Sequence, residues 1–322
     1  MAASRRAVLI AGVALAGPAI AGAQAWPGER PIQIIVPFPP GGGTDVNIRA
    51  MVPHFERHLR GARFVVMNRP GAGAEIGYTA MAQAAPDGHT IGTVITPSLQ
   101  TITIERQPRY TLDDFAFLGS VVEDPSAFQV APDSPFRTVA DLVAFARANP
   151  GAVSVGTAGI GSDDHLLMIG LERAAGIRLN HIPFAGQAPT VTALLGGHIQ
   201  VASMNMGESM SLIRSGRVRP LASAGAERFP MTPDVPTFRE AGYALDTRVV
   251  RSLVVPAATP QPIRERLADM LAATMRDRAW ISEAERLEIP LRYLNAEDTR
   301  ALVYREAEAL RRLWAEQPWR DQ

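Results

Sequence analysis

The strongest constraint on the fold is a glycine-rich corner at residues 34–45, with the sequence IIVPFPPGGGTD. The β-branched run at 34–36 predicts an inner strand of a parallel sheet, and the prolines that follow end its pairing. Three glycines at 41–43 permit a tight turn and a close approach of another molecule, and Thr44 is a favourable N-cap for a helix. Because the first N–H groups of a helix lack intrahelical partners and carry partial positive charge, we expect an anion-binding corner.

Residues 1–25 have the pattern of a cleaved export signal. Arg5 and Arg6 precede an uncharged run at 7–23, and a small-x-small cleavage pattern ends at Ala25. The run contains glycine and proline and is shorter than the roughly 20 residues of a membrane-spanning helix. Both the general secretory route and the twin-arginine route fit this start. We expect an exported mature chain that begins near residue 26.

Two residue types are missing from the sequence, and their absence excludes several kinds of site. There is no cysteine, so disulfides, thiolate metal sites, a cysteine nucleophile and a lipid-modified cysteine anchor are excluded. All 32 basic residues are arginine, which excludes a P-loop lysine and a Schiff-base lysine. The mature chain would carry two arginines fewer, against 32 acidic residues, and this near balance argues against nucleic acid or an anionic membrane as partner.

The pattern of strand, glycine-rich turn and helix recurs along the chain. A second glycine-rich loop, GTAGIGSDDH at 156–165, follows a predicted strand and opens a predicted helix in the same way as the first corner. The strand expected at 90–95 ends in Thr96 and Ser98, whose hydroxyls could face the same crevice. We predict further helices at 45–60, 139–148, 262–278 and 298–316, strands at 64–67, 153–156, 180–184, 199–204, 221–224 and 249–255, and extended chain at 115–130.

This alternation predicts two α/β lobes. We assign residues 26–124 and 250–322 to the first lobe and 125–249 to the second, joined by crossing segments near 123–128 and 248–253. Because ligands of open α/β sheets bind at the carboxyl ends of strands, a small ligand is expected in a cleft where it contacts both glycine loops.

Six ordered motifs resemble the periplasmic substrate-binding proteins of tripartite tricarboxylate transporters, also known as the Bordetella uptake gene (Bug, TctC-like) family. The motifs span nearly all of the mature chain: VPFPPGGGTD at 36–45, NRPGAGAEIG at 68–77, APDGHT at 85–90, GTAGIGSDDHL at 156–166, LLGGHIQ at 194–200 and PDVPTFREAGY at 233–243.

The resemblance implies a two-lobed type II periplasmic binding-protein fold that closes like a Venus flytrap. It implies a soluble periplasmic monomer that captures a small organic acid or zwitterionic carboxylate and delivers it to membrane permease subunits, with no cofactor, no metal and no catalysis. The ligand contacts carried over from the family are Phe38, Gly42, Gly43, Thr44 and Asp45 on the first lobe, and Gly161, Ser162, Phe184, Gly186, Gln187 and Ala188 on the second.

Departures from the family pattern bear on the ligand, and their interpretation stays open. Asp163 and Asp164 are either solvent-facing acids in the first turn of a helix capped by Ser162, or carboxylates in the cleft that select a ligand with an ammonium group. The run ending in His165 does not favour a metal site, because adjacent helical residues point in different directions.

Three further positions differ. Phe184 and Ala185 stand where a tyrosine and a lysine are common, so a possible cationic contact is lost, and Asn205 follows a strand where an acid or amide is usual. Arg248 and Arg251 lie in the returning crossover. One of them either restores the missing positive charge in the cleft or is a surface or interlobe arginine paired with a nearby acid.

Two other function classes, a hydrolase and a ligand-sensing subunit, are alternatives to a binding protein for transport. A hydrolase would need Ser162 and His165 as nucleophile and base, but Ser162 is better explained as a helix cap, and no G-x-S-x-G elbow occurs. A periplasmic subunit that senses the ligand for a membrane signalling protein would share the same fold and site, and it remains the alternative.

Overall fold

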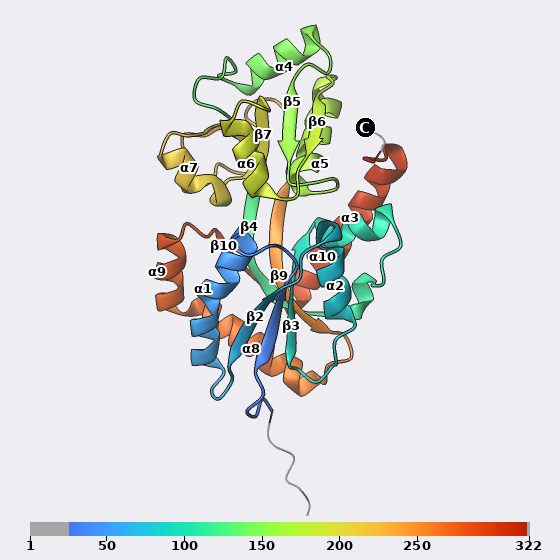
Figure 1. Cartoon of the computed structure of the whole chain (residues 1–322), viewed down its shortest axis with the longest axis vertical. Coiled ribbons are helices and arrows are strands. Elements are labelled where there is room, and N and C mark those ends of the chain that lie inside the picture. Colours follow the sequence, from blue (N-terminus) through green and yellow to red (C-terminus); the bar gives the residue numbers. More distant parts are fainter. Residues whose placement is uncertain (1–25, 321–322) are drawn as a thin grey trace, which may run out of the picture.

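A computed structural model describes residues 26–320, so the export signal expected at 1–25 lies outside the described residues. Strands of the described chain follow the order β2-β1-β3-β9-β4-β7-β5-β6, with β8 and β10 also paired to β4 (Figure 1). The strands are β1 (Ile32–Val36), β2 (Phe64–Asn68), β3 (Thr90–Thr96), β4 (Phe115–Val130), β5 (Ser154–Thr157), β6 (Asn180–Pro183), β7 (Val201–Asn205), β8 (Arg219–Ser223), β9 (Arg248–Pro256) and β10 (Leu291–Asn295).

The helices pack on both faces of these strands. They are α1 (Gly43–His58), α2 (Glu75–Ala82), α3 (Ser98–Glu105), α4 (Val139–Ala148), α5 (Asp163–Ala175), α6 (Gln187–Leu195), α7 (Met210–Arg214), α8 (Gln261–Arg276), α9 (Arg278–Arg286) and α10 (Ala296–Glu316), with single 3-10 turns η1 (Ala72–Ala74), η2 (Leu112–Asp114) and η3 (Gly207–Ser209). No helix within 26–320 is both long and apolar enough to cross a membrane.

The long strand β4 links two lobes. Its first part pairs antiparallel with β9, as far as Pro125 opposite Arg248, and its last part pairs with β7 and β8 from Ser126 onward. Around it, β1 pairs in parallel with β2 and β3 in the lower lobe, and β5 pairs in parallel with β6 and β7 in the upper lobe (Figure 1). The predicted two-lobed α/β fold is therefore confirmed.

Each lobe has its own apolar core. In the lower lobe, buried side chains of β1, α1, α8 and α9 pack on one face of the sheet, and those of α2, α3 and α10 pack on the other. In the upper lobe, the core lies between β4, β5, α4 and α5. The apolar run predicted at 34–36 is buried in these cores, as expected for an inner parallel strand.

Most predicted elements occur, and the differences have local causes. The extended segment at 115–130 and the helix at 139–148 have the predicted bounds, whereas the single helix predicted at 262–278 is wrong at its end. Asp277 interrupts it, because its carboxylate accepts the Ala279 N–H at 2.9 Å and starts α9 as an N-cap. Helices α3 and α9 and the edge strand β10 were not predicted.

Candidate functional site

The N-terminus of α1 forms one side of the candidate site. The helix begins at Gly43, and Gly42 precedes it with extended backbone (φ −74°, ψ 163°) and no side-chain cap. The prediction that Thr44 caps the helix is therefore wrong. Thr44 lies in the first turn, buried, where its hydroxyl accepts a hydrogen bond from Arg251 Nε at 3.3 Å. The turn keeps its partial positive charge without a capping side chain, which suits an anion.

Asp45 stabilises the loop before α1. This buried carboxylate accepts the Gly41 N–H at 2.9 Å, Arg49 Nε at 3.0 Å and Asn68 Nδ2 at 2.8 Å. Burial disfavours the charged form, but these hydrogen bonds outweigh it and lower the pKa of Asp45. Its acceptors are engaged by the protein, which makes Asp45 a support for the glycine loop.

Arg251 is the buried cation of the site, with 3% of its surface exposed. It lies on β9 opposite Ile95 and Val122, and it pairs with Glu208. With the Asn47 amide in the orientation that satisfies both of its atoms, Asn47 also accepts Arg251 Nη1 at 3.3 Å. Arg251 is therefore not a surface arginine, and its pairing with Glu208 agrees with the interlobe form of the ion-pair interpretation.

Arg248, three residues earlier on β9, has a different environment. It pairs with Asp246 at 2.8 Å and with Glu306 at 3.2 Å, as the pairing interpretation predicts. The two arginines therefore have separate partners, and only Arg251 reaches the first turn of α1 through Thr44.

Glu208 was not among the predicted site residues, although it follows the carboxyl end of β7. Asp124 on β4 holds its backbone: Gly207 N–H donates to Asp124 Oδ1 at 2.7 Å, and Glu208 N–H donates to Oδ2 at 3.3 Å. The Glu208 side chain then reaches Gly43, where an added Cβ would lie 2.7 Å from Glu208 Cδ. The Gly-Glu pair shortly after the predicted strand end was the sequence pattern that could have indicated this residue.

Asp163 lies at the start of α5, on the other side of the junction between the lobes. It is buried and accepts Ser126 Oγ and Asn205 Nδ2, each at 2.7 Å. The predicted Ser162 cap of α5 is confirmed, since Ser162 Oγ accepts the His165 N–H at 3.3 Å. Asp163 and Asn205, both predicted site residues, are thus brought together by α5 and β7.

Burial raises the pKa of several carboxylates near this junction. Burial raises the pKa of Asp124 to about 7, although the charge of Arg251 and the Gly207 N–H oppose this shift. Burial also raises the pKa of Asp163 against the hydrogen bonds from Ser126 and Asn205. The pKa of Asp164 is raised by burial and then by the charge of Asp163.

The solvent-facing interpretation of Asp163 and Asp164 is wrong, because they are only 6% and 2% exposed. Asp164 Oδ2 accepts the Ala158 N–H at 3.3 Å, which ties α5 to its glycine loop. The next residue, His165, stacks on His181 with ring centroids 3.9 Å apart, and burial lowers the His165 pKa to about 3. Within residues 26–320, no group of three or more acids and histidines is arranged to hold a metal ion.

The remaining predicted residues surround this centre at different depths. Gly161 O accepts Thr101 Oγ1 at 2.9 Å, a hydrogen bond from α3 to the second glycine loop. Thr96 is buried on β3 beside β9, and Ser98 begins α3. Phe38 is half-buried and packs against both apolar clusters of the lower lobe. Phe184 is half-buried in the upper lobe. Residues Gly186, Gln187 and Ala188 lie at the start of α6.

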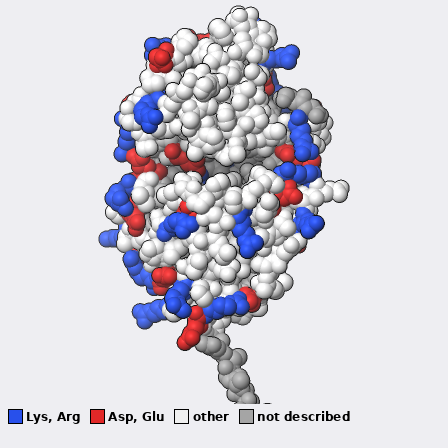
Figure 2. All heavy atoms as spheres, viewed as in Figure 1, with Lys and Arg blue, Asp and Glu red and all other residues white. Residues whose placement is uncertain are grey.

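A hollow band crosses the molecule between the two lobes, with acidic side chains at both ends of the band in this view (Figure 2). The elements that meet at the junction are the start of α1, the start of α5, β4, β9 and η3. Together they offer a cation, a helix N-terminus and several carboxylates and amides, a set that can bind a small polar molecule.

Comparison with known proteins identifies the family. A family model described as "Tripartite tricarboxylate transporter family receptor" matches residues 50–316. The chain belongs to this receptor family. Its members are periplasmic solute-binding receptors, and the family is not an enzyme family.

Individual relatives of this receptor cover most of its length. Protein BugT of Bordetella pertussis (strain Tohama I / ATCC BAA-589 / NCTC 13251) is 35% identical over 247 residues, which is 73% of this chain and 72% of BugT. An R. palustris protein solved with adipate has a TM-score of 0.83 at 26% identity, covering 90% of this chain and 97% of that one. MatC from Rhodopseudomonas palustris with bound malate has a TM-score of 0.74 at 26% identity, covering 91% and 98%.

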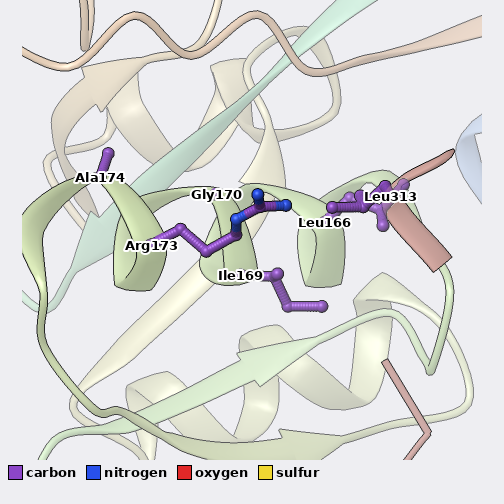
Figure 3. Close-up of a pocket in the computed structure, with 6 residues that line it drawn as sticks. All are labelled: Leu166, Ile169, Gly170, Arg173, Ala174 and Leu313. Carbon is purple, nitrogen blue, oxygen red and sulfur yellow. The ribbon is translucent and has the colours of Figure 1, made fainter. Parts of the chain in front are cut away.

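A second hollow, of about 340 Å³, lies between α5 and α10 and shares none of its lining residues with the site around Arg251 (Figure 3). Leu166, Ile169 and Leu313 give it an aliphatic lining, and its one charged lining residue, Arg173, pairs with Glu316 at 2.9 Å. A polar metabolite would find few partners here, so we place the candidate site around Arg251 and the starts of α1 and α5.

Proposed function

We propose that this protein captures a small carboxylate-bearing metabolite between its lobes and delivers it to the permease of a tripartite tricarboxylate transporter. The observation that carries this proposal is the buried Arg251 beside the uncapped N-terminus of α1. A cation and free helical N–H groups act on the same anion, and hydrogen bonds to charged groups are the stronger ones in proteins.

The ligand carboxylate would lie against Gly43 and Thr44, with Arg251 behind it. Thr44 belongs to the first turn of α1, and its contact with Arg251 aligns the two sources of positive charge. The solved relatives bound to adipate and malate support a small carboxylate as the ligand class. The second lobe would then contribute Asn205 and the start of α5 from the opposite side of the cleft.

Capture would proceed by closure of one lobe on the other. We assign residues 26–124 and 250–322 to one lobe and 125–249 to the other, since β4 exchanges its partner β9 for β7 and β8 after Pro125. The change of pairing makes this point of β4 the natural hinge, together with the start of β9. We further propose that the protein acts in the periplasm as a monomer, after removal of residues 1–25.

The test is native mass spectrometry of the purified protein incubated with a pool of mono-, di- and tricarboxylates. We expect one acid to be bound and recovered chemically unchanged, and calorimetry with that acid then gives its affinity. Conversion of the acid would indicate an enzyme, and the absence of any bound acid would contradict carboxylate capture. Co-purification with the membrane permease tests the assignment to transport.

A further inference from the structure

Glu208 lies where the proposed function places the ligand carboxylate. Its carboxylate contacts Gly43 at the N-terminus of α1 and pairs with Arg251. Resting on that proposed function, we propose that Glu208 is a stand-in for the ligand: its carboxylate occupies the position that the ligand carboxylate would take, and the incoming carboxylate must displace it.

The hydrogen bonds of Arg251 explain why a carboxylate occupies this position. Two of its donors point to α1, with Nε on Thr44 and Nη1 on Asn47, whereas Nη2 is directed to Glu208 of the other lobe. Arg251 is 3% exposed, and a buried charge without a partner is strongly unfavourable. A carboxylate that faces Nη2 therefore stabilises the contact between the lobes, and in this structure that carboxylate belongs to Glu208.

Glu208 is also able to leave this position. Its backbone is held independently, because Asp124 accepts the N–H groups of Gly207 and Glu208. Its side chain is 19% exposed, compared with 3% for Arg251, so rotation toward solvent does not require the buried arginine to move. Binding would then exchange one carboxylate for another on Arg251, while the backbone of η3 stays in place.

The exchange has consequences for affinity and selectivity. Only molecules in which Glu208 has left Arg251 can bind the ligand, and the apparent dissociation constant rises by the inverse of their fraction. If Glu208 occupies the site in about nine molecules of ten, binding is therefore weakened about tenfold. Ligands must also hold Arg251 and the α1 N-terminus better than a glutamate side chain does. Glu208 thus sets which carboxylates bind, and it favours their release.

Calorimetry with malate and adipate as probes tests this role in the full-length mature protein. Glu208→Gln should tighten binding about tenfold, and Glu208→Ala, which leaves no acceptor, should tighten it at least as much. The matched control is Glu227→Gln, an exposed glutamate of the same lobe, which should bind like wild type. Combined with Arg251→Gln, Glu208→Gln should have no further effect.

Weaker binding by Glu208→Gln would overturn the proposal and indicate instead that Glu208 receives a cationic group of the ligand. Unchanged binding would overturn it as well. If wild type binds neither probe, the proposed function is in question, and small-angle scattering of the unliganded proteins decides on Glu208. Glu208→Ala should then give a larger radius of gyration than wild type or Glu227→Gln, and an equal radius would refute the stand-in.

Discussion

Adding one methyl group at Gly43 should strongly weaken carboxylate capture without unfolding the protein. A Cβ at this position would lie 2.7 Å from the Cδ of the carboxylate now seated there, whereas ordinary van der Waals contact begins at 3.4 Å. A ligand carboxylate in the same place would be pushed away from the α1 N-terminus. Each charge-assisted hydrogen bond lost is worth about 1.5–3 kcal/mol, so Gly43→Ala should weaken binding roughly 10- to 100-fold.

Stability should change little, because only the far end of the Glu208 side chain has to shift to make room, and alanine favours a helix at the first residue of α1. We expect the free energy of unfolding to stay within about 1 kcal/mol of wild type. Gly42→Ala is the matched control, since its Cβ would have Pro39 O as nearest atom at 3.7 Å. Calorimetry and urea unfolding measure both quantities. If folded Gly43→Ala binds within twofold of Gly42→Ala, the α1 N-terminus is not the carboxylate site.

Two more substitutions probe the same junction. Arg251→Gln should weaken carboxylate binding at least about tenfold in calorimetry by removing a charged donor, and an unchanged affinity would show that the arginine has no part in binding. The pKa of Asp124 is about 7 in the folded protein against an ordinary 3.8, so the folded state holds this proton more tightly than the unfolded state. The Asp124 contribution to stability is therefore fully present below about pH 4 and is lost as the pH rises to about 7. In urea unfolding, the free energy of unfolding of Asp124→Asn should fall less than that of wild type over this pH range. A slope equal to that of wild type would contradict this assignment.

Local sequence patterns predicted most of the helices and strands. Glycine loops after β-branched runs located the starts of α1 and α5, because the chemistry of a strand-to-helix turn is decided by adjacent residues. The points at which helices end within long polar segments were predicted less well. The division between α8 and α9 depends on one capping residue, Asp277, in a segment with continuous helical character.

The candidate site was only partly readable, because its key contacts join distant parts of the chain. Arg248 and Arg251 look alike in sequence, and only the partners brought by α1 and η3 separate them. The burial of Asp163 depends on Ser126 and Asn205, which lie 37 and 42 residues away. Glu208 was missed for the same reason, since its partner is 43 residues further along and in the other lobe.

The most direct test of carboxylate capture is a crystal structure of the protein with the acid identified by native mass spectrometry. We expect one ligand carboxylate against the N–H groups of Gly43 and Thr44, hydrogen-bonded to Arg251, with the Glu208 side chain turned away. A ligand bound elsewhere, for example in the aliphatic hollow between α5 and α10, would contradict the proposed site. So would a ligand carboxylate in the cleft with the Arg251 and Glu208 pair still intact.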